Sequence, residues 1–266
     1  DVVEDQGPGG HAAARVGGRE GSGVRGGQPG VDRVVEPADE ERARVVGCGV
    51  GVAPGEVGAE AGPRAHRWRS AENSPGSLLP HLRPGMSLLD VGCGPATVTV
   101  DLADRVGDGR VVGVDASEAV LDSARELAAQ RGTANISFQH ANAYELPFAD
   151  GTFDVVYAHQ LLQHLSAPIG ALREMRRVTK PGGLVDVRDA DSAAMPWYPA
   201  APGLTEWNTL YHEVTHAYGY EADAGRRLFS WVQDAGFPLD GIEPSASTWC
   251  YATPADRTWW GGLWAE

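Results

Sequence analysis

The chain has 266 residues and a formal net charge of −14, without an apolar run long enough to cross a bilayer. The acidic balance disfavours a general nucleic-acid binder, because phosphate contacts need clustered Lys and Arg. Three widely spaced cysteines match neither a metal site nor a disulfide framework, so we expect a reducing, cytoplasmic setting.

Residues 1–63 differ in composition from the rest of the chain. They contain no Leu, Ile, Met, Phe, Trp, Tyr or Lys, whereas all eight tryptophans follow them. Such a segment has little apolar bulk to offset the entropy lost on ordering. We expect a low-complexity segment that is disordered or mistranslated, with a binding tail as the alternative, followed by one folded domain over residues 64–266.

Strands and helices alternate in the rest of the chain, after a short helix near Ser77. This order predicts an α/β fold with a doubly wound, mostly parallel, Rossmann-like sheet that binds ligands at the carboxyl ends of its strands. Strands are expected at about 87–92, 110–115, 136–140, 153–158, 184–190 and 240–251, and helices at about 96–106, 117–131, 168–179, 204–218 and 223–235.

The stretch "LLDVGCGPAT" predicts a strand, a glycine turn and a helix, which is the plan of a nucleotide-like ligand site. The dinucleotide fingerprint requires Gly or Ala at its sixth position, counted from Gly92 as the first, where this chain has Thr97. Asp90 would also repel a pyrophosphate, but it suits the cationic end of S-adenosylmethionine. Alternatively, Asp90 only ties down the following loop, and both roles can coexist.

Asp115 ends the next expected strand, 21 residues after Gly94 (115 − 94). An acid there can accept hydrogen bonds from both ribose hydroxyls. Both ligand classes use such an acid, so Asp115 alone does not discriminate between them. Together with Asp90 it favours S-adenosylmethionine.

Four motifs in order resemble those of class I S-adenosylmethionine-dependent methyltransferases: "LLDVGCGPAT", "VVGVDAS", "ANAYELPFADGTFDVVYAHQLLQHL" and "LREMRRVTKPGGLV". The chain is most similar to the ubiquinone/menaquinone-biosynthesis C-methyltransferase type, over about residues 66–192 and more loosely to 266. The resemblance implies methyl transfer to a small metabolite by in-line displacement, and the aromatic residues after the fifth strand suggest a hydrophobic or aromatic acceptor. A nicotinamide-dependent oxidoreductase and a cofactor-binding fragment without activity remain as alternatives.

The resemblance also implies which residues hold the cofactor. The family's third glycine is replaced by Ala96, a small loss if its φ stays negative, and an Asp that accepts from adenine is replaced by Asn142. Arg69 could meet the carboxylate of the cofactor. The full set is Arg69, Asp90, Gly92, Cys93, Gly94, Asp115, Ala116, Ser117, Asn142, Ala143, His159 and Gln160.

The sequence supplies only weak candidates for a catalytic base, namely His159, His164 and Asp191. Asp189 and Tyr198 are further candidates. Each could equally be a packing or solvated residue. His212 and His216 have the i,i+4 spacing of a metal pair but no evident third ligand, so we expect no metal. The expected wall of the acceptor pocket, within about 193–266, is Trp197, Tyr198, Trp207 and Tyr211.

One family feature has no counterpart in the sequence. The family sheet closes with an antiparallel seventh strand between the fifth and sixth, and no segment before Glu266 matches it. We therefore expect a sheet without its last strand, or a chain incomplete at its C-terminus. The oligomeric state is not indicated.

Overall fold

The computed structural model describes residues 43–51 and 69–263. Their core is a seven-stranded sheet in the order β4-β3-β2-β5-β6-β1-β7, and every strand pairing in it is parallel. The strands are β1 (Arg44–Gly51), β2 (Leu88–Val91), β3 (Val111–Asp115), β4 (Ile136–His140), β5 (Phe153–His159), β6 (Thr179–Ala190) and β7 (Ile242–Ser247).

The strand order contains the reversal that makes a ligand site. From β2 the chain builds outward through β3 to β4, and then returns to β5 on the other side of β2. Two neighbouring crossovers thus leave the sheet in opposite directions at the β2–β5 pair. The carboxyl ends of β2 and β5 border the crevice where ligands of such sheets bind.

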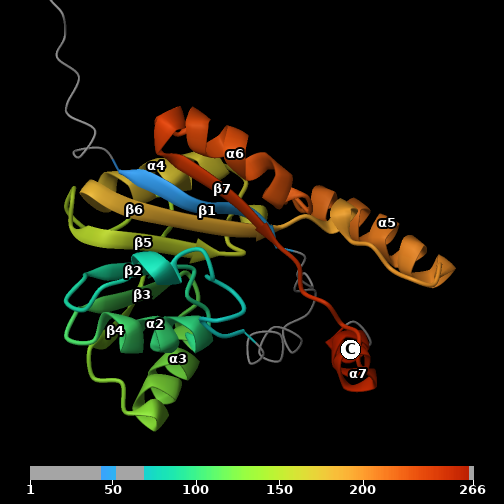
Figure 1. The fold of residues 1–266 in the computed structure, drawn as a ribbon, viewed down its shortest axis with the longest axis horizontal. Helices are drawn as coiled ribbons and strands as arrows, with labels where there is room; N and C mark the ends of the chain where they lie inside the picture. Colours follow the sequence, from blue (N-terminus) through green and yellow to red (C-terminus); the bar gives the residue numbers. More distant parts are fainter. Residues whose placement is uncertain (1–42, 52–68, 264–266) are drawn as a thin grey trace, which may run out of the picture. The chain divides into compact units, whose positions relative to one another are not determined.

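Helices cover both faces of the sheet (Figure 1). The α2–α3 face includes Leu88, Val155 and Leu184, whereas the α4–α6 face includes Leu89, Val156 and Val185. Adjacent residues are therefore buried on opposite faces, as expected for parallel strands. The helices are α2 (Thr97–Val106), α3 (Glu118–Arg131), α4 (Pro168–Val178), α5 (Pro202–Ala217), α6 (Ala224–Asp234) and α7 (Pro254–Leu263).

Local signals explain where the helices begin and end. Ser117 caps α3 by accepting from the Val120 N–H at 3.4 Å, and left-handed Gly132 ends the helix. Proline occupies the first position of α4 and of α5, where its missing N–H costs nothing. These are the signals on which the predicted boundaries depended.

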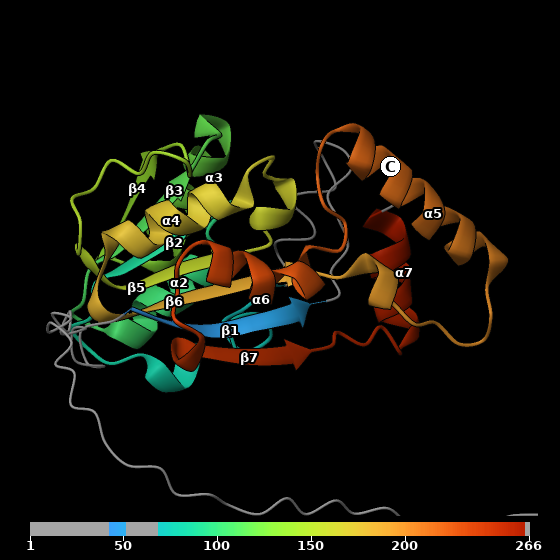
Figure 2. The same cartoon turned by 90° about the horizontal axis from the view of Figure 1, so that it is seen from above.

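The expectation of disorder over residues 1–63 is wrong for Arg44–Gly51, which form β1. This strand lies between β6 and β7, parallel to both, which is where the family's missing strand was expected (Figure 2). The described residues have no antiparallel strand after β7, as the sequence predicted, and the parallel N-terminal strand β1 occupies that position instead. Alternating Val and Gly can form a strand once a neighbour on each side completes its hydrogen bonds. The rest of residues 1–63 lies outside the described residues.

Smaller differences concern other boundaries. β6 begins at Thr179, before the "KPGG" that was expected to precede it, and β7 ends at Ser247. Pro244 lies within β7 and is tolerated there because β7 is an edge strand. Short 3-10 turns are η2 (Leu79–His81), η3 (Leu162–His164), η4 (Ser192–Ala194) and η5 (Leu239–Gly241). Among residues 43–51 and 69–263, none of the helices has the length and apolarity of a bilayer span.

Candidate functional site

The glycine turn joins β2 to α2 at the predicted place. Gly92 and Gly94 have φ values of 73° and 53°, in the left-handed region that favours glycine. A Cβ on Gly92 would lie 2.9 Å from Cδ1 of Leu161, so glycine also permits the close approach of the turn after β5. The N–H groups of Gly92 and Cys93 both donate to the Val114 carbonyl, at 2.8 and 3.0 Å, which fixes the turn against β3.

Ala96 differs from the sequence expectation. The loss of glycine was expected to be small at a negative φ, but Ala96 has a φ of 65° and is fully buried. A left-handed alanine costs on the order of 1–2 kcal/mol. Its methyl group packs with Val100 and Ala124, which recovers part of that cost.

Asp115 ends β3 beside the turn, and its carboxylate organises the site. Oδ2 accepts from the Gly94 N–H at 3.1 Å, and Oδ1 accepts from the Ser117 N–H at 2.9 Å. Each oxygen keeps a second lone pair, so a partly exposed Asp115 can still accept from a vicinal diol. The arrangement fits the ribose of a nucleoside ligand.

Asp90 lies in β2, 3% exposed, and accepts from Oγ1 of Thr99 at 2.7 Å. Burial raises the pKa of Asp90 to about 7, the hydrogen bond from Thr99 opposes that shift, and the charge of Asp115 adds to it. Two neighbouring carboxylates make an anion such as a pyrophosphate costly here. A cationic group would instead stabilise the ionised Asp90.

The predicted adenine contacts lie after β4. Asn142 is exposed, and its Oδ1 accepts from the Tyr144 N–H at 3.0 Å within a local turn. Ala143 is partly buried against the core of the α4–α6 face. Ala116 lies between Asp115 and Ser117, with its carbonyl 3.1 Å from Nε2 of His140. The carboxyl ends of β2, β3 and β4 therefore lie along one edge of the sheet, as the sequence predicted.

The end of β5 brings His159, Gln160 and Arg69 together. Gln160 is left-handed, with a φ of 55°, and its N–H donates to the Arg188 carbonyl at 2.7 Å. Nη2 of Arg69 donates to Oε1 of Gln160. Both side chains are nine-tenths buried or more, so the segment that begins at Arg69 is docked at the end of β5.

The other predicted bases have structural partners. Asp191 forms a two-point ion pair with Arg226, at 2.6 and 2.8 Å, and caps η4. His164 lies 2.9 Å from the Gln163 amide nitrogen and edge-on to Tyr220. Asp189 accepts from the Gln163 N–H at 3.0 Å, and burial raises its pKa to about 7. His159, 8% exposed, is the predicted base that lies next to Gln160.

His212 and His216 do not form a metal pair in the described part of the chain. Nε2 of His212 lies 3.0 Å from Asp223, and its Nδ1 lies 2.7 Å from the Asn208 carbonyl, whereas His216 is exposed. Burial lowers the pKa of His212, but its contacts with Asn208 and Asp223 outweigh this and raise it. The contact between His212 and Asp223 links α5 to the start of α6.

The residues predicted to wall the acceptor pocket belong only in part to the aromatic cluster that the structure shows. Trp207 and Tyr211 stack on α5 with ring centroids 5.6 Å apart, and Trp260 of α7 lies edge-on to Trp207 at 5.4 Å. Tyr251 follows at 6.2 Å from Trp260. The structure does not bring Tyr198 into this cluster, because Tyr198 is 98% exposed. Trp197 is partly buried, outside the ring contacts of the described residues.

Comparisons with known proteins bear directly on this geometry. The model of a family described as a methyltransferase domain matches residues 82–236. An uncharacterised methyltransferase of Schizosaccharomyces pombe is 39% identical over 73% of this chain and 72% of its own length. The chain belongs to the methyltransferase domain family.

Other relatives carry related names. A demethylmenaquinone methyltransferase of Bacillus cereus is 32% identical, over 62% of this chain and 68% of its own. A solved structure of a SAM-dependent methyltransferase from Aquifex aeolicus is 26% identical, with a TM-score of 0.44, covering 55% of this chain and 80% of that one.

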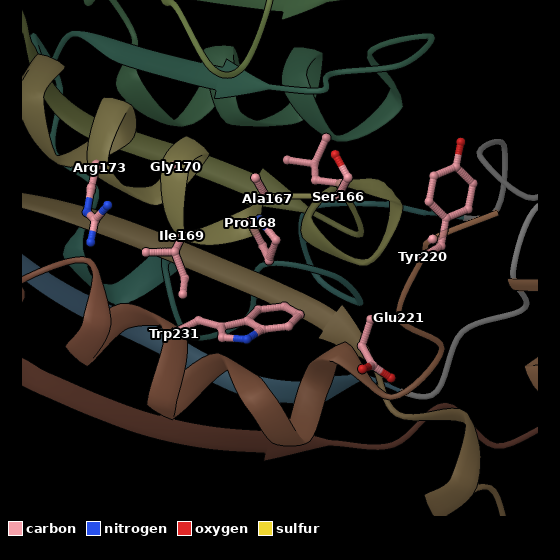
Figure 3. Close-up of a pocket in the computed structure, with 11 residues that line it drawn as sticks. Ser166, Ala167, Pro168, Ile169, Gly170, Arg173, Tyr220, Glu221 and Trp231 are labelled. Carbon is pink, nitrogen blue, oxygen red and sulfur yellow. The ribbon is translucent and has the colours of Figure 1, made fainter. Parts of the chain in front are cut away.

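This methyltransferase also has a pocket of about 550 Å³ between α4 and α6 (Figure 3). Two charged groups that line it are engaged: Arg173 donates to the Asp234 carbonyl at 3.1 Å, and Glu221 pairs with Arg227 at 2.7 Å. The pocket lies on the α4–α6 side, whereas Asp90 lies in β2 on the same side of the strand as Leu88, under α2. It is therefore separate from the glycine-turn site.

Four residues that contact predicted site residues or the aromatic cluster escaped the sequence analysis: Arg188, Trp249, Tyr251 and Trp260. Arg188 lies 6% exposed in β6 and Trp249 lies 8% exposed after β7. The many aromatic residues in "WCYATPADRTWW" could have indicated an aromatic cluster, but the sequence does not show that this segment packs against α5.

Proposed function

We propose that this chain transfers a methyl group from S-adenosylmethionine to a small hydrophobic or aromatic metabolite by in-line displacement. The observation that carries the proposal is the pair of neighbouring carboxylates, Asp90 and Asp115, at the glycine turn. Their charge favours a cationic ligand with a ribose over a dinucleotide. When bound, the cofactor supplies a sulfonium-activated methyl group.

The residues present fit this cofactor in three respects. Asp115 has free lone pairs for the ribose hydroxyls, and Gly92 and Gly94 let a ligand approach the backbone. Buried Asp90 would be stabilised by the positive end of a sulfonium amino acid. Arg69, held by Gln160, offers a guanidinium to the carboxylate of that amino acid.

The proposed acceptor is apolar or aromatic because aromatic side chains gather beside this site. Trp207, Tyr211, Tyr251 and Trp260 present ring faces and edges for a planar molecule. Burial raises the pKa of Tyr251 and the nearby charge of Arg69 opposes that shift, which supports placing this cluster near the cofactor. Orienting the acceptor in line with the reacting bond can supply on the order of 7–11 kcal/mol of the rate enhancement.

The substitution Asp115→Ala tests the cofactor assignment. It removes the carboxylate that would accept from the ribose and that also orders the glycine turn through Gly94. Since two hydrogen bonds to a charged group are lost, we expect the affinity for S-adenosylmethionine to fall about 100-fold. Titration calorimetry of the wild type and the variant measures this directly.

The control is Asp104→Ala, which removes an exposed carboxyl group from α2. It should leave the affinity unchanged. Equal affinity of the Asp115→Ala variant would show that the ribose is misplaced, and binding of NAD without binding of S-adenosylmethionine would overturn the cofactor assignment. Transfer of labelled methyl to a component of a metabolite extract tests the reaction itself, and no transfer to any acceptor in a broad screen would favour a cofactor-binding fragment without activity.

A further inference from the structure

Residues 69–78, here called the cover segment, are fixed to the body of the domain at several points. Arg69 is bound by Gln160 at the end of β5, and the Ala71 N–H donates to Asp101 of α2 at 3.0 Å. Oγ of Ser77 donates to Asp186 of β6 at 3.2 Å. The segment thus makes contacts with the end of β5, with α2 and with β6.

The middle of the cover segment is held by Arg188 and Trp249. Nη1 of Arg188 donates to the carbonyls of Asn73, at 3.3 Å, and of Ser74. Nε1 of Trp249 donates to the same Asn73 carbonyl at 2.7 Å. Two donors from different parts of the chain therefore meet at one turn of the cover segment.

Arg188 and Trp249 also contact each other. The guanidinium carbon lies 5.2 Å from the centre of the indole ring, within the range of a cation–π interaction, and both residues are more than nine-tenths buried. Among the described residues, Nε and Nη2 of Arg188 have no hydrogen-bond partner. The indole face therefore stabilises this buried cation, together with the charge of Asp186.

Trp249 further connects the cover segment to the candidate reaction site. Its ring is edge-on to His159 at 6.0 Å, and Tyr251, two residues later, belongs to the aromatic cluster. The Arg188 carbonyl accepts from Gln160, whose side chain accepts from Arg69. The Ser70 N–H, next to Arg69 in the chain, donates to Oδ1 of Asn73 at 2.8 Å, so a circuit runs from Arg188 through Gln160, Arg69 and Ser70 to Asn73 and back to Arg188.

We propose that Arg188 and Trp249 are positioning residues that clamp the cover segment, so that cofactor affinity depends on the segment after β7. This inference rests on the proposed function for its ligand. Neither residue needs to touch the cofactor, because they act on Arg69 through the turn at Asn73. Trp249 holds the cover segment, and Tyr251 of the aromatic cluster lies two residues after it. The position of the cover segment is therefore coupled to the position of the aromatic cluster.

Trp249→Phe in the full chain tests the clamp. It keeps an aromatic face for Arg188 and an edge partner for His159, but removes the N–H that donates to Asn73. We expect S-adenosylmethionine to bind about 3- to 10-fold more weakly, as for one lost hydrogen bond, and amide hydrogen exchange across residues 70–78 to accelerate. Arg188→Lys, which keeps the charge but loses the planar guanidinium, should change both readouts in the same direction.

The matched control is Trp231→Phe on α6, which removes an indole N–H from the α4–α6 pocket. It should alter neither the affinity nor the exchange of residues 70–78, even if the unfolding midpoint falls. Wild-type affinity and wild-type exchange in the Trp249→Phe variant would overturn the clamp. A wild-type chain that binds no S-adenosylmethionine would overturn the proposed function instead, and the exchange of residues 70–78 would still decide the clamp.

Discussion

At the scale of single residues, buried carboxyl groups make stability depend on pH. Asp186 of β6 is fully buried, accepts from Ser77, and lacks a partner for Oδ1 among the described residues. Burial raises the pKa of Asp186 to about 7, against the opposing charge of Arg188. In the unfolded chain the group titrates near about pH 4, so between about 4 and 7 the folded state binds the extra proton. Its contribution to stability therefore falls as the pH rises through that window.

Asp186→Asn should remove this dependence, because an amide does not ionise. We expect the variant to gain stability relative to the wild type between about pH 5.5 and pH 8, on the order of 2 kcal/mol. Urea unfolding at both pH values measures the difference. Asp154→Asn is a control with the opposite expected effect. Burial raises the pKa of Asp154, but Lys180 and Ser87 outweigh burial and hold that pKa below its usual range. The Asp154→Asn variant should therefore be less stable than the wild type at both pH values. A pH-independent difference for Asp186→Asn would contradict the prediction.

The positions of Asp90 and Asp115, the proposed cofactor carboxylates, in the fold could be predicted from sequence because each follows from local rules. Asp90 and Asp115 lie at fixed positions relative to a glycine turn and a strand end. Arg188 and Trp249 could not, since their role depends on a turn at Asn73 that is 115 and 176 residues away in the chain. The left-handed φ of Ala96 was likewise hidden, because alanine gives no signal for that conformation.

At the scale of secondary-structure elements, helix periodicity located α5 and α6 but not how closely each packs. Gly225 and Gly203 are each the second residue of their helix, α6 and α5. A Cβ on Gly225 would lie 2.9 Å from the Asp189 carbonyl oxygen and 3.0 Å from that of Ala190. The same Cβ on Gly203 would meet nothing within 4 Å. Only the tertiary structure distinguishes these two glycines.

Gly225→Ala and Gly203→Ala should therefore have opposite effects. The added methyl of Gly225→Ala pushes α6 away from the end of β6, and we expect a loss of about 2 kcal/mol in the free energy of unfolding. Gly203→Ala reduces the freedom of the unfolded chain without a clash and should gain up to about 1 kcal/mol. Chemical denaturation of both variants is the measurement. Two stabilised variants would mean that α6 lies farther from β6 than the structure places it.

At the scale of the whole domain, the sequence predicted the doubly wound sheet but assigned β1 to the wrong class of structure. Apolar runs and turn residues identify β2 to β6, because each of these strands adjoins α2, α3 or α4 in the chain. β1 has no such context: its sequence, "RVVGCGVG", is separated from β6 by 127 residues (179 − 51 − 1). Its strand conformation depends on β6 and β7, which pair with it from both sides. Composition alone could not reveal that long-range pairing.

The place of β1 can be tested with two adjacent residues. Val45 is fully buried in the core of the α4–α6 face, whereas Arg44 is exposed. Since neighbours along a strand point to opposite faces, Val45→Asp buries an unpaired carboxylate and should lower the free energy of unfolding by about 3 kcal/mol or more. Arg44→Asp introduces the same carboxylate at the surface and should cost less than about 1 kcal/mol. Equal and small effects of both variants would show that Arg44–Gly51 is not part of the sheet, whereas a slip of one residue in register would reverse which variant is destabilised.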